Sequence, residues 1–171
     1  MLTTERLTLV PHKPEHFEAY AGFWGKDPGH FLRSLAPMRP EDAWGRLLRN
    51  YGHWTHYGWG PFLGFDQSGM LVVEAGYADF HRGLGPRFDG APEGMWKVDL
   101  DAQGWGLATE AMTAITGWFD GTPHASRTVC MIDPDNLVSI RVAGKLGFTE
   151  FERTTYKDTP IVLFERLTAP R

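Results

Sequence analysis

A glycine-bearing stretch from Asp99 to Ala111, with the sequence Asp-Leu-Asp-Ala-Gln-Gly-Trp-Gly-Leu-Ala-Thr-Glu-Ala, holds the residues best suited to binding a ligand. Gly104 and Gly106 let several backbone N–H groups converge at the start of a helix, where the helix dipole adds partial positive charge. Such a turn can hold a pyrophosphate. It is not a Walker loop, because no Gly-Lys-Ser/Thr follows, and Thr109 stands where a dinucleotide fingerprint needs its third Gly or Ala. Taken alone, the stretch is equally consistent with an ordinary strand-to-helix turn.

The pattern around this turn predicts the elements that must position it. Residues 93–100 have strand character, and residues 104–119 place apolar side chains on one stripe at helical spacing. A short β-branched strand at 127–132 makes the connection a parallel crossover. A further helix is expected over about 136–146, where Gly147 suits a left-handed cap.

The rest of the chain supplies the other layers of a mixed α/β fold. The predicted order is β-α-α-β-β-β-α-β-α-β-β, with a loop rich in Gly and Pro at 25–39. The elements expected outside the crossover region are a strand at 6–10, helices at 14–24 and 40–58, strands at 61–66 and 70–81, and a closing strand pair at 151–155 and 161–166.

Composition limits the classes of protein that are possible. The 171 residues are 42% hydrophobic and 22% charged, which suits one folded domain over residues 1–171. The net charge of -4 argues against a broad nucleic-acid-binding face, and the single Cys130 excludes an intramolecular disulfide framework. No apolar run reaches membrane-spanning length, and residues 1–6 lack the apolar core of a signal peptide. We therefore expect a cytoplasmic protein without a nucleic-acid or membrane partner.

A second motif, about thirty residues after the glycine turn, changes the interpretation of that turn. From Asn136 to Phe148 the sequence is Asn-Leu-Val-Ser-Ile-Arg-Val-Ala-Gly-Lys-Leu-Gly-Phe. Together with Gln-Gly-x-Gly-x-Ala-Thr-Glu-Ala, this motif resembles the GNAT superfamily of N-acetyltransferases, and most closely its branch that acetylates ribosomal-protein N-termini. The opening Glu-Arg-Leu-Thr-Leu at 5–9 and the spacing from Glu93 to Gln103 also fit that branch. The resemblance spans nearly the whole chain and is strongest over 93–148.

The resemblance implies a fold and a way of binding acetyl-CoA. The fold is a single domain with a mixed, centrally splayed β-sheet flanked by helices, in which the strands 93–100 and 127–132 part. The pyrophosphate lies on the turn after the first of these strands, and the pantetheine arm runs beside residues 97–100. The implied binding residues are Val98, Leu100, Gln103, Gly104, Trp105, Gly106, Leu107, Ala108, Thr109, Asn136, Ser139 and Arg141, although Arg141 and its neighbour Lys145 are as consistent with a solvated helix face.

The implied reaction is direct attack of a primary amine on the acetyl thioester. An ammonium cannot attack, so a base must first take its proton. Glu93 is the first candidate because it begins the strand that lines the thioester, with Asp79 and His81 as alternates. The other interpretation of Glu93 is an exposed carboxylate at a strand end. A backbone N–H near Val98 would meet the tetrahedral oxyanion.

The departing CoA thiolate needs a hydrogen-bond donor or a proton. Many members of the superfamily place a tyrosine in the helix after the second motif, but this chain has Ala143 there. Ser139 is the nearest replacement, with Asn136 beside it at the thioester end of the helix. A serine that bonds back to the carbonyl four residues earlier is the alternative interpretation. Tyr156, from the closing strand pair, is a further hydroxyl that could reach the site.

Other side chains that could do chemistry lack the partners they would need. His53 and His56 are one helical turn apart but have no Glu-rich or Cys-rich set beside them, so helix packing is favoured over a metal site, and no metal is expected. Cys130 fits a buried apolar position, and Trp105 stands in the phosphate turn.

The acceptor is either a peptide or protein N-terminus or a small amine. The loops 25–39 and 82–92 are expected to select it, and they carry Arg33, Arg39, Arg82, Arg87 and Asp89. Whether the protein is a monomer or a homodimer is undecided. A non-catalytic acyl-CoA-binding or regulatory module is the alternative function, because the usual tyrosine is missing and the base is open.

Overall fold

Twelve strands and helices make up the structure, a computed structural model that describes residues 1–26 and 37–168. In chain order they are β1 (Leu2–Thr3), β2 (Thr8–Pro11), α1 (Phe17–Gly25), α2 (Pro40–Tyr57), β3 (Phe62–Phe65), β4 (Leu71–Ala78), β5 (Glu93–Val98), α3 (Leu107–Phe119), β6 (Arg127–Ile132), α4 (Leu137–Lys145), β7 (Thr149–Tyr156) and β8 (Thr159–Leu167). Short 3₁₀ turns precede α1 and follow β5. Within the described part of the chain, no helix is long and apolar enough to cross a bilayer.

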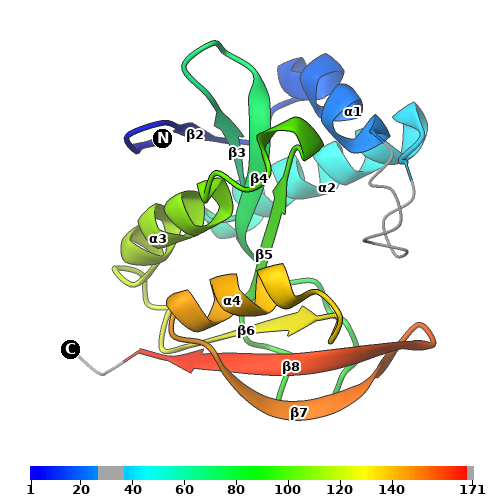
Figure 1. Cartoon of the computed structure of the whole chain (residues 1–171), viewed down its shortest axis with the longest axis vertical. Helices are drawn as coiled ribbons and strands as arrows, with labels where there is room; N and C mark the ends of the chain where they lie inside the picture. Colours follow the sequence, from blue (N-terminus) through cyan, green and yellow to red (C-terminus); the bar gives the residue numbers. More distant parts are fainter. Residues whose placement is uncertain (27–36, 169–171) are drawn as a thin grey trace.

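The strands form one sheet in the order β1-β2-β3-β4-β5-β6-β8-β7 (Figure 1). The pairs on either side of the centre are antiparallel, whereas β5 and β6 run parallel with α3 as their crossover helix. The sequence predicts this crossover correctly. The parallel pair is joined by a single bridge, between Glu93 and Val129, after which the two strands part. The predicted mixed, centrally splayed α/β sheet is confirmed.

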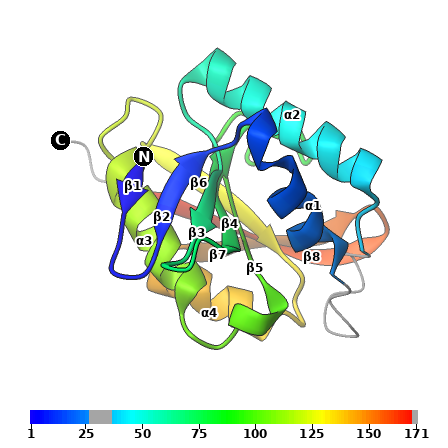
Figure 2. The same ribbon diagram turned by 90° about the horizontal axis from the view of Figure 1, so that it is seen from above.

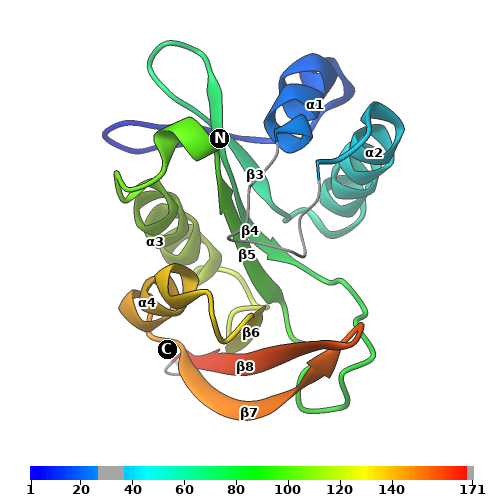
Figure 3. The same ribbon diagram turned by 45° about the vertical axis from the view of Figure 1, so that its right-hand side comes forward.

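Helices cover both faces of the sheet (Figures 2 and 3). On one face, apolar side chains of α1 and α2 pack against Leu63 of β3 and Leu71 of β4. On the other face, α3 and α4 bury their apolar stripes against the inner strands, with Met112 and Ile115 fully buried. This burial of apolar area is what stabilises the layers, and it leaves the parted strands at the centre between the two pairs of helices.

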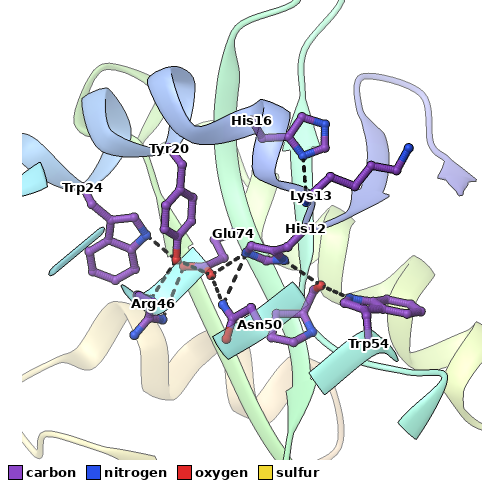
Figure 4. A network of polar contacts seen from close by, with 10 residues as sticks. His12, Lys13, His16, Tyr20, Trp24, Arg46, Asn50, Trp54 and Glu74 are labelled. Atoms are coloured by element: carbon purple, nitrogen blue, oxygen red, sulfur yellow. Dashed lines mark hydrogen bonds and ion pairs between the residues drawn. The ribbon is translucent and has the colours of Figure 1, made fainter. Parts of the chain in front are cut away.

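A buried polar network also joins α1 and α2 to the sheet (Figure 4). The carboxylate of Glu74, at the middle of β4, is fully buried. It accepts hydrogen bonds from Tyr20 Oη at 2.9 Å and Trp24 Nε1 at 3.0 Å on α1, and from Asn50 Nδ2 at 2.8 Å on α2. His12 Nε2 lies 2.9 Å from the same carboxylate. A buried charge of this kind is tolerated only because it is so well bonded.

The element boundaries differ from the sequence prediction around the glycine turn and at the end of β4, which stops at Ala78 instead of residue 81. The strand expected over 93–100 ends at Val98, and residues 100–102 form a 3₁₀ turn. The helix expected from Gly104 begins at Leu107 instead. The reason is backbone geometry, because Gly104 and Gly106 have φ angles of 83° and 77°, outside the helical region. The two-residue strand β1 was not predicted.

Candidate functional site

Beyond its single bridge to β6, strand β5 has backbone groups that face an opening in the sheet. The N–H of Asp99 donates to Val72 O of β4 at 2.8 Å, whereas Pro92 O accepts a hydrogen bond from Val129 N of β6 at 3.0 Å. Successive peptide groups of a strand point in opposite directions, so Trp96 and Val98 direct their N–H and C=O groups toward β6. Among the described residues, no strand pairs with them there. They can therefore bond an extended ligand that carries amides.

The turn between β5 and α3 presents a run of free backbone donors. Residues 104–109 donate their N–H groups to no acceptor in the described part of the chain, and the first intrahelical bond is from Glu110 N to Gly106 O at 3.0 Å. Both glycines have positive φ, and a Cβ built on either would meet nothing within 4 Å. Trp105 between them is 71% exposed. An open surface of amide donors at a helix N-terminus is suited to a phosphate or pyrophosphate.

An ion pair from the N-terminal segment holds this turn in place. Arg6 Nη1 donates to Trp105 O at 2.9 Å, and Arg6 Nε donates to Glu110 Oε2 at 2.7 Å. Thr4 Oγ1 donates to the other oxygen of the same carboxylate at 2.6 Å. Although burial opposes the shift, the hydrogen bonds from Thr4 and Arg6 lower the pKa of Glu110. Sequence reasoning missed this role of Glu110, which its place in the first turn of a helix could have suggested.

Leu100 and Gln103 lie between the end of β5 and the turn. Gln103 N donates to Leu100 O at 3.4 Å, and this hydrogen bond closes the 3₁₀ turn that comes directly before Gly104. The buried Asp99 accepts from Lys26 Nζ at 2.8 Å, so the end of α1 is tied to the same segment. Leu107 is buried, and Ala108 and Thr109 are half-buried at the helix start.

The start of α4 faces β5 across the opening. Asn136 caps the helix, with its Oδ1 accepting from Ser139 N at 3.0 Å. Ser139 Oγ accepts from Trp96 Nε1 at 3.2 Å and makes no bond back to the carbonyl four residues earlier. The hydroxyl hydrogen of Ser139 is therefore free to donate elsewhere. Arg141, further along α4, is exposed and has no ion-pair partner among the described residues.

Glu93 begins β5 at the point where the strands part, and it is buried, with 4% of its surface exposed. The interpretation of Glu93 as an exposed strand-end carboxylate is therefore wrong. Both of its oxygens accept from Arg82, whose Nε and Nη2 lie at 2.8 Å. Burial raises the pKa of Glu93 even though Arg82 opposes the shift. The two alternates pair with each other instead, with His81 Nε2 3.2 Å from Asp79 Oδ2.

Side chains on β5 alternate between the two faces of the sheet. Trp96 reaches α4, so Glu93 and Lys97 lie on the face covered by α1 and α2. Lys97 Nζ donates to Phe23 O at 3.0 Å and lies 3.9 Å from the Phe23 ring centroid. Burial lowers the pKa of Lys97 to about 8. A ligand between β5 and β6 would thus meet different side chains on its two sides.

The remaining candidates have packing or partner roles. Tyr156, from the β7–β8 hairpin, lies beside Arg82, whose guanidinium is 5.5 Å from its ring centroid. His53 Nε2 accepts from Asp79 N at 3.0 Å, which places the ring proton on Nδ1, 2.8 Å from Trp59 O. Cys130 is buried, and burial raises the pKa of its thiol well above the usual value. Arg33 lies outside the described residues.

Residues 6–149 match the family described as the acetyltransferase (GNAT) domain. The chain belongs to this acetyltransferase family. The sequence resemblance to GNAT enzymes is thereby confirmed, and the matched residues include both motifs and the parted strands β5 and β6.

Solved structures show the same relationship. A protein from Bordetella pertussis assigned to the GnaT acetyltransferase family is 34% identical, with a TM-score of 0.86 over 96% of this chain and 98% of that one. An acetyltransferase from Agrobacterium tumefaciens is 25% identical, with a TM-score of 0.77 over 98% and 94%. RimL, a ribosomal alpha-N-protein acetyltransferase solved in complex with coenzyme A, is 16% identical, with a TM-score of 0.79 over 96% and 95%, and so shares the fold. No curated protein matches this GNAT chain.

Proposed function

We propose that this GNAT enzyme moves an acetyl group from acetyl-CoA to a primary amine by direct attack. The observation that supports the proposal most strongly is that two sets of unpaired backbone groups lie next to each other, one in the turn before α3 and one on β5. The free N–H groups of residues 104–109 suit the pyrophosphate, and the outward-facing peptide groups of Trp96 and Val98 suit the amides of the pantetheine arm. A strand beside a parted neighbour offers these groups at no cost in broken protein hydrogen bonds.

The cofactor-binding residues that we propose follow the two motifs. Some of them lie on β5 and in the turn, where Leu100 and Gln103 orient the backbone. The others lie on α4, where the exposed Arg141 would bind the 3′-phosphate of coenzyme A. The set is Val98, Leu100, Gln103, Gly104, Trp105, Gly106, Leu107, Ala108, Thr109, Asn136, Ser139 and Arg141. We treat residues 1–171 as one domain that carries the whole site.

For the chemistry, we assign a base to the α1–α2 face and a donor to the α4 face. Glu93 accepts the proton of the incoming ammonium through water, because its own oxygens are held by Arg82. Ser139 donates its free hydroxyl hydrogen toward the departing thiolate, held in position by Trp96 and the Asn136 cap. The N–H of Val98 supports the oxyanion. The likeness to RimL, a ribosomal alpha-N-protein acetyltransferase, supports a peptide or protein N-terminus as acceptor, with a small amine as the alternative.

Two measurements on the purified protein test the proposal together. Acetyl-CoA is expected to raise the Tm, since a ligand that binds only the folded state stabilises it. Free thiol is expected to appear when a panel of N-terminal peptides, polyamines, aminoglycosides and amino acids is added. Stabilisation without thiol release from any amine would favour the non-catalytic module, for which the alanine at position 143 and the fully paired Glu93 are the supporting features.

Glu93→Gln is expected to lower kcat/KM for the acceptor by about 100-fold, the usual scale for loss of a general base. The carboxylate acts only when ionised, so wild-type activity should fall as the pH drops through its pKa. Because that pKa is raised, the fall should begin at a higher pH than an ordinary carboxyl would give. The measurement is a pH profile of kcat/KM, with the KM for acetyl-CoA expected to stay unchanged.

Glu150→Gln is the matched control, because Glu150 is an exposed carboxylate on β7 with its own arginine partner, Arg153. It should leave the profile as in the wild type. Glu93→Gln with normal Tm and an unshifted profile would remove Glu93 from the mechanism.

A further inference from the structure

Arg49 stands beside the Glu93–Arg82 pair on the face of the sheet covered by α1 and α2. Its guanidinium carbon lies 5.4 Å from the centroid of the Phe80 ring, and that of Arg82 lies 4.5 Å from the same centroid. Arg82 in turn donates twice to Glu93 at 2.8 Å. Phe80 therefore links Arg49 to the carboxylate that we place beside the reacting amine.

Two buried carboxylates on this face are already paired with arginines. Glu93 is neutralised by Arg82, and the buried Glu74 lies 3.3 Å from Arg46. No carboxylate of the described residues forms an ion pair with Arg49, which is exposed at its position on α2. Loss of hydration, and then the nearby Arg46, lower the pKa of Arg49. Among the described residues, Arg49 thus has no ion-pair partner, although it stands near the Glu93 carboxylate that Arg82 holds.

A simple ammonium approaching Glu93 would meet repulsion from Arg49. An amine that also carries a negative group would be attracted, because its anion can occupy the free guanidinium while its nitrogen reaches the base.

We propose that the acceptor carries a carboxylate close to its reacting amine, and that Arg49 binds this carboxylate. The inference rests on the proposed function and narrows it from any primary amine to an anionic one. The planar guanidinium suits a carboxylate because two parallel N–H donors match its two oxygens. The carboxylate belongs either to a free amino acid or to an acidic side chain near a peptide N-terminus, and the experiment separates these two sources.

The test compares acceptor pairs that differ in one carboxylate, with kcat/KM corrected for the fraction of each amine that is unprotonated, because removing a carboxylate also lowers the pKa of a nearby amine. Serine is matched with serinamide, and a short peptide with Asp at its second position is matched with the same peptide carrying Asn. The wild-type enzyme is expected to prefer the anionic member of at least one pair by about tenfold in kcat/KM, the scale of one charge-assisted hydrogen bond, mainly through KM. The pair that shows the preference identifies the source of the carboxylate.

Arg49→Gln is expected to remove most of that preference while leaving the KM for acetyl-CoA unchanged. Arg49→Lys should recover part of the preference, because lysine keeps the positive charge but cannot donate two parallel hydrogen bonds to the carboxylate. Arg153→Gln is the matched control, since Arg153 is an exposed arginine already paired with Glu150 on β7, and it should behave as wild type.

Equal turnover of both members of each pair by the wild type would overturn the inference and leave the proposed function standing. The same holds if Arg49→Gln, with a normal Tm, keeps the wild-type preference. No thiol release with any amine, despite stabilisation by acetyl-CoA, would contradict the proposed function and the inference with it.

Discussion

Gly104→Glu and Gly106→Glu are each expected to weaken binding of coenzyme A by at least about 100-fold, or nearly 3 kcal/mol. Each glycine lies on the exposed turn where the N–H groups of residues 104–109 converge. A glutamate side chain would project into the open space above the turn and place a negative charge where we expect a pyrophosphate. Isothermal titration calorimetry with coenzyme A measures the loss directly.

Gly69→Glu is the matched control for this experiment. Gly69 has a φ of 85°, close to those of Gly104 and Gly106, and a Cβ there would also meet nothing within 4 Å. It lies in the turn between β3 and β4, outside the run of free donors at residues 104–109. All three variants therefore carry the same backbone strain, of about 1–2 kcal/mol. Unchanged coenzyme affinity in Gly104→Glu and Gly106→Glu would refute the assignment of the turn.

Glu74→Gln is expected to lower the free energy of unfolding by about 3–5 kcal/mol, the scale for removing one partner of a buried ion pair. The side chain of Glu74 is fully buried, and Arg46 Nη2 lies 3.3 Å from it. An amide cannot accept from all the donors gathered there, so His12 or Arg46 would be left without a partner. Urea denaturation at neutral pH measures the change.

The same carboxylate makes stability depend on pH in a defined range. Burial works to raise its pKa, but the charge of Arg46 and the hydrogen bond with His12 prevail and lower the pKa to about 2 from 4.5. A lowered pKa contributes stability that is fully present above pH 4.5 and is lost as the pH falls toward 2, by about 3 kcal/mol for a shift of this size. Glu74→Gln should lack this part of the acid dependence.

Glu150→Gln serves as the comparison, because Glu150 is an exposed carboxylate that also pairs with an arginine, Arg153. Its removal should change stability little, since exposed ion pairs contribute little. An equal loss in Glu74→Gln and Glu150→Gln, or an acid dependence that survives Glu74→Gln, would contradict the role assigned to the buried network.

Most of the fold could be predicted from the sequence because periodicity reports which side chains share a face. The helix α3 and the strand β6 follow directly from their apolar spacing. The resemblance of both motifs to the GNAT family predicted the opening between β5 and β6. The helix start was misplaced by three residues because Gly104 and Gly106 look permissive in a pattern, whereas their positive φ angles keep the backbone out of the helix.

The side-chain partners within the site could not be predicted in the same way. Glu93 was expected at the strand start, but its pairing with Arg82 depends on how a loop rich in Gly and Pro folds back. The bond from Trp96 to Ser139 joins residues 43 positions apart. Periodicity carries no information on such contacts, although the lone acidic residue in the apolar run of β4, Glu74, was a signal that could have been followed.

Because Glu93 and Val129 form the only bridge between β5 and β6 in the described sheet, the sheet has two halves that are joined at a single residue pair. Elsewhere in the sheet, neighbouring strands pair over several residues, whereas β5 and β6 share a single bridge. If acetyl-CoA binds in this opening as we propose, its amides would supply the hydrogen bonds that β5 and β6 do not make to each other. The stability of the folded enzyme would then increase with the concentration of acetyl-CoA.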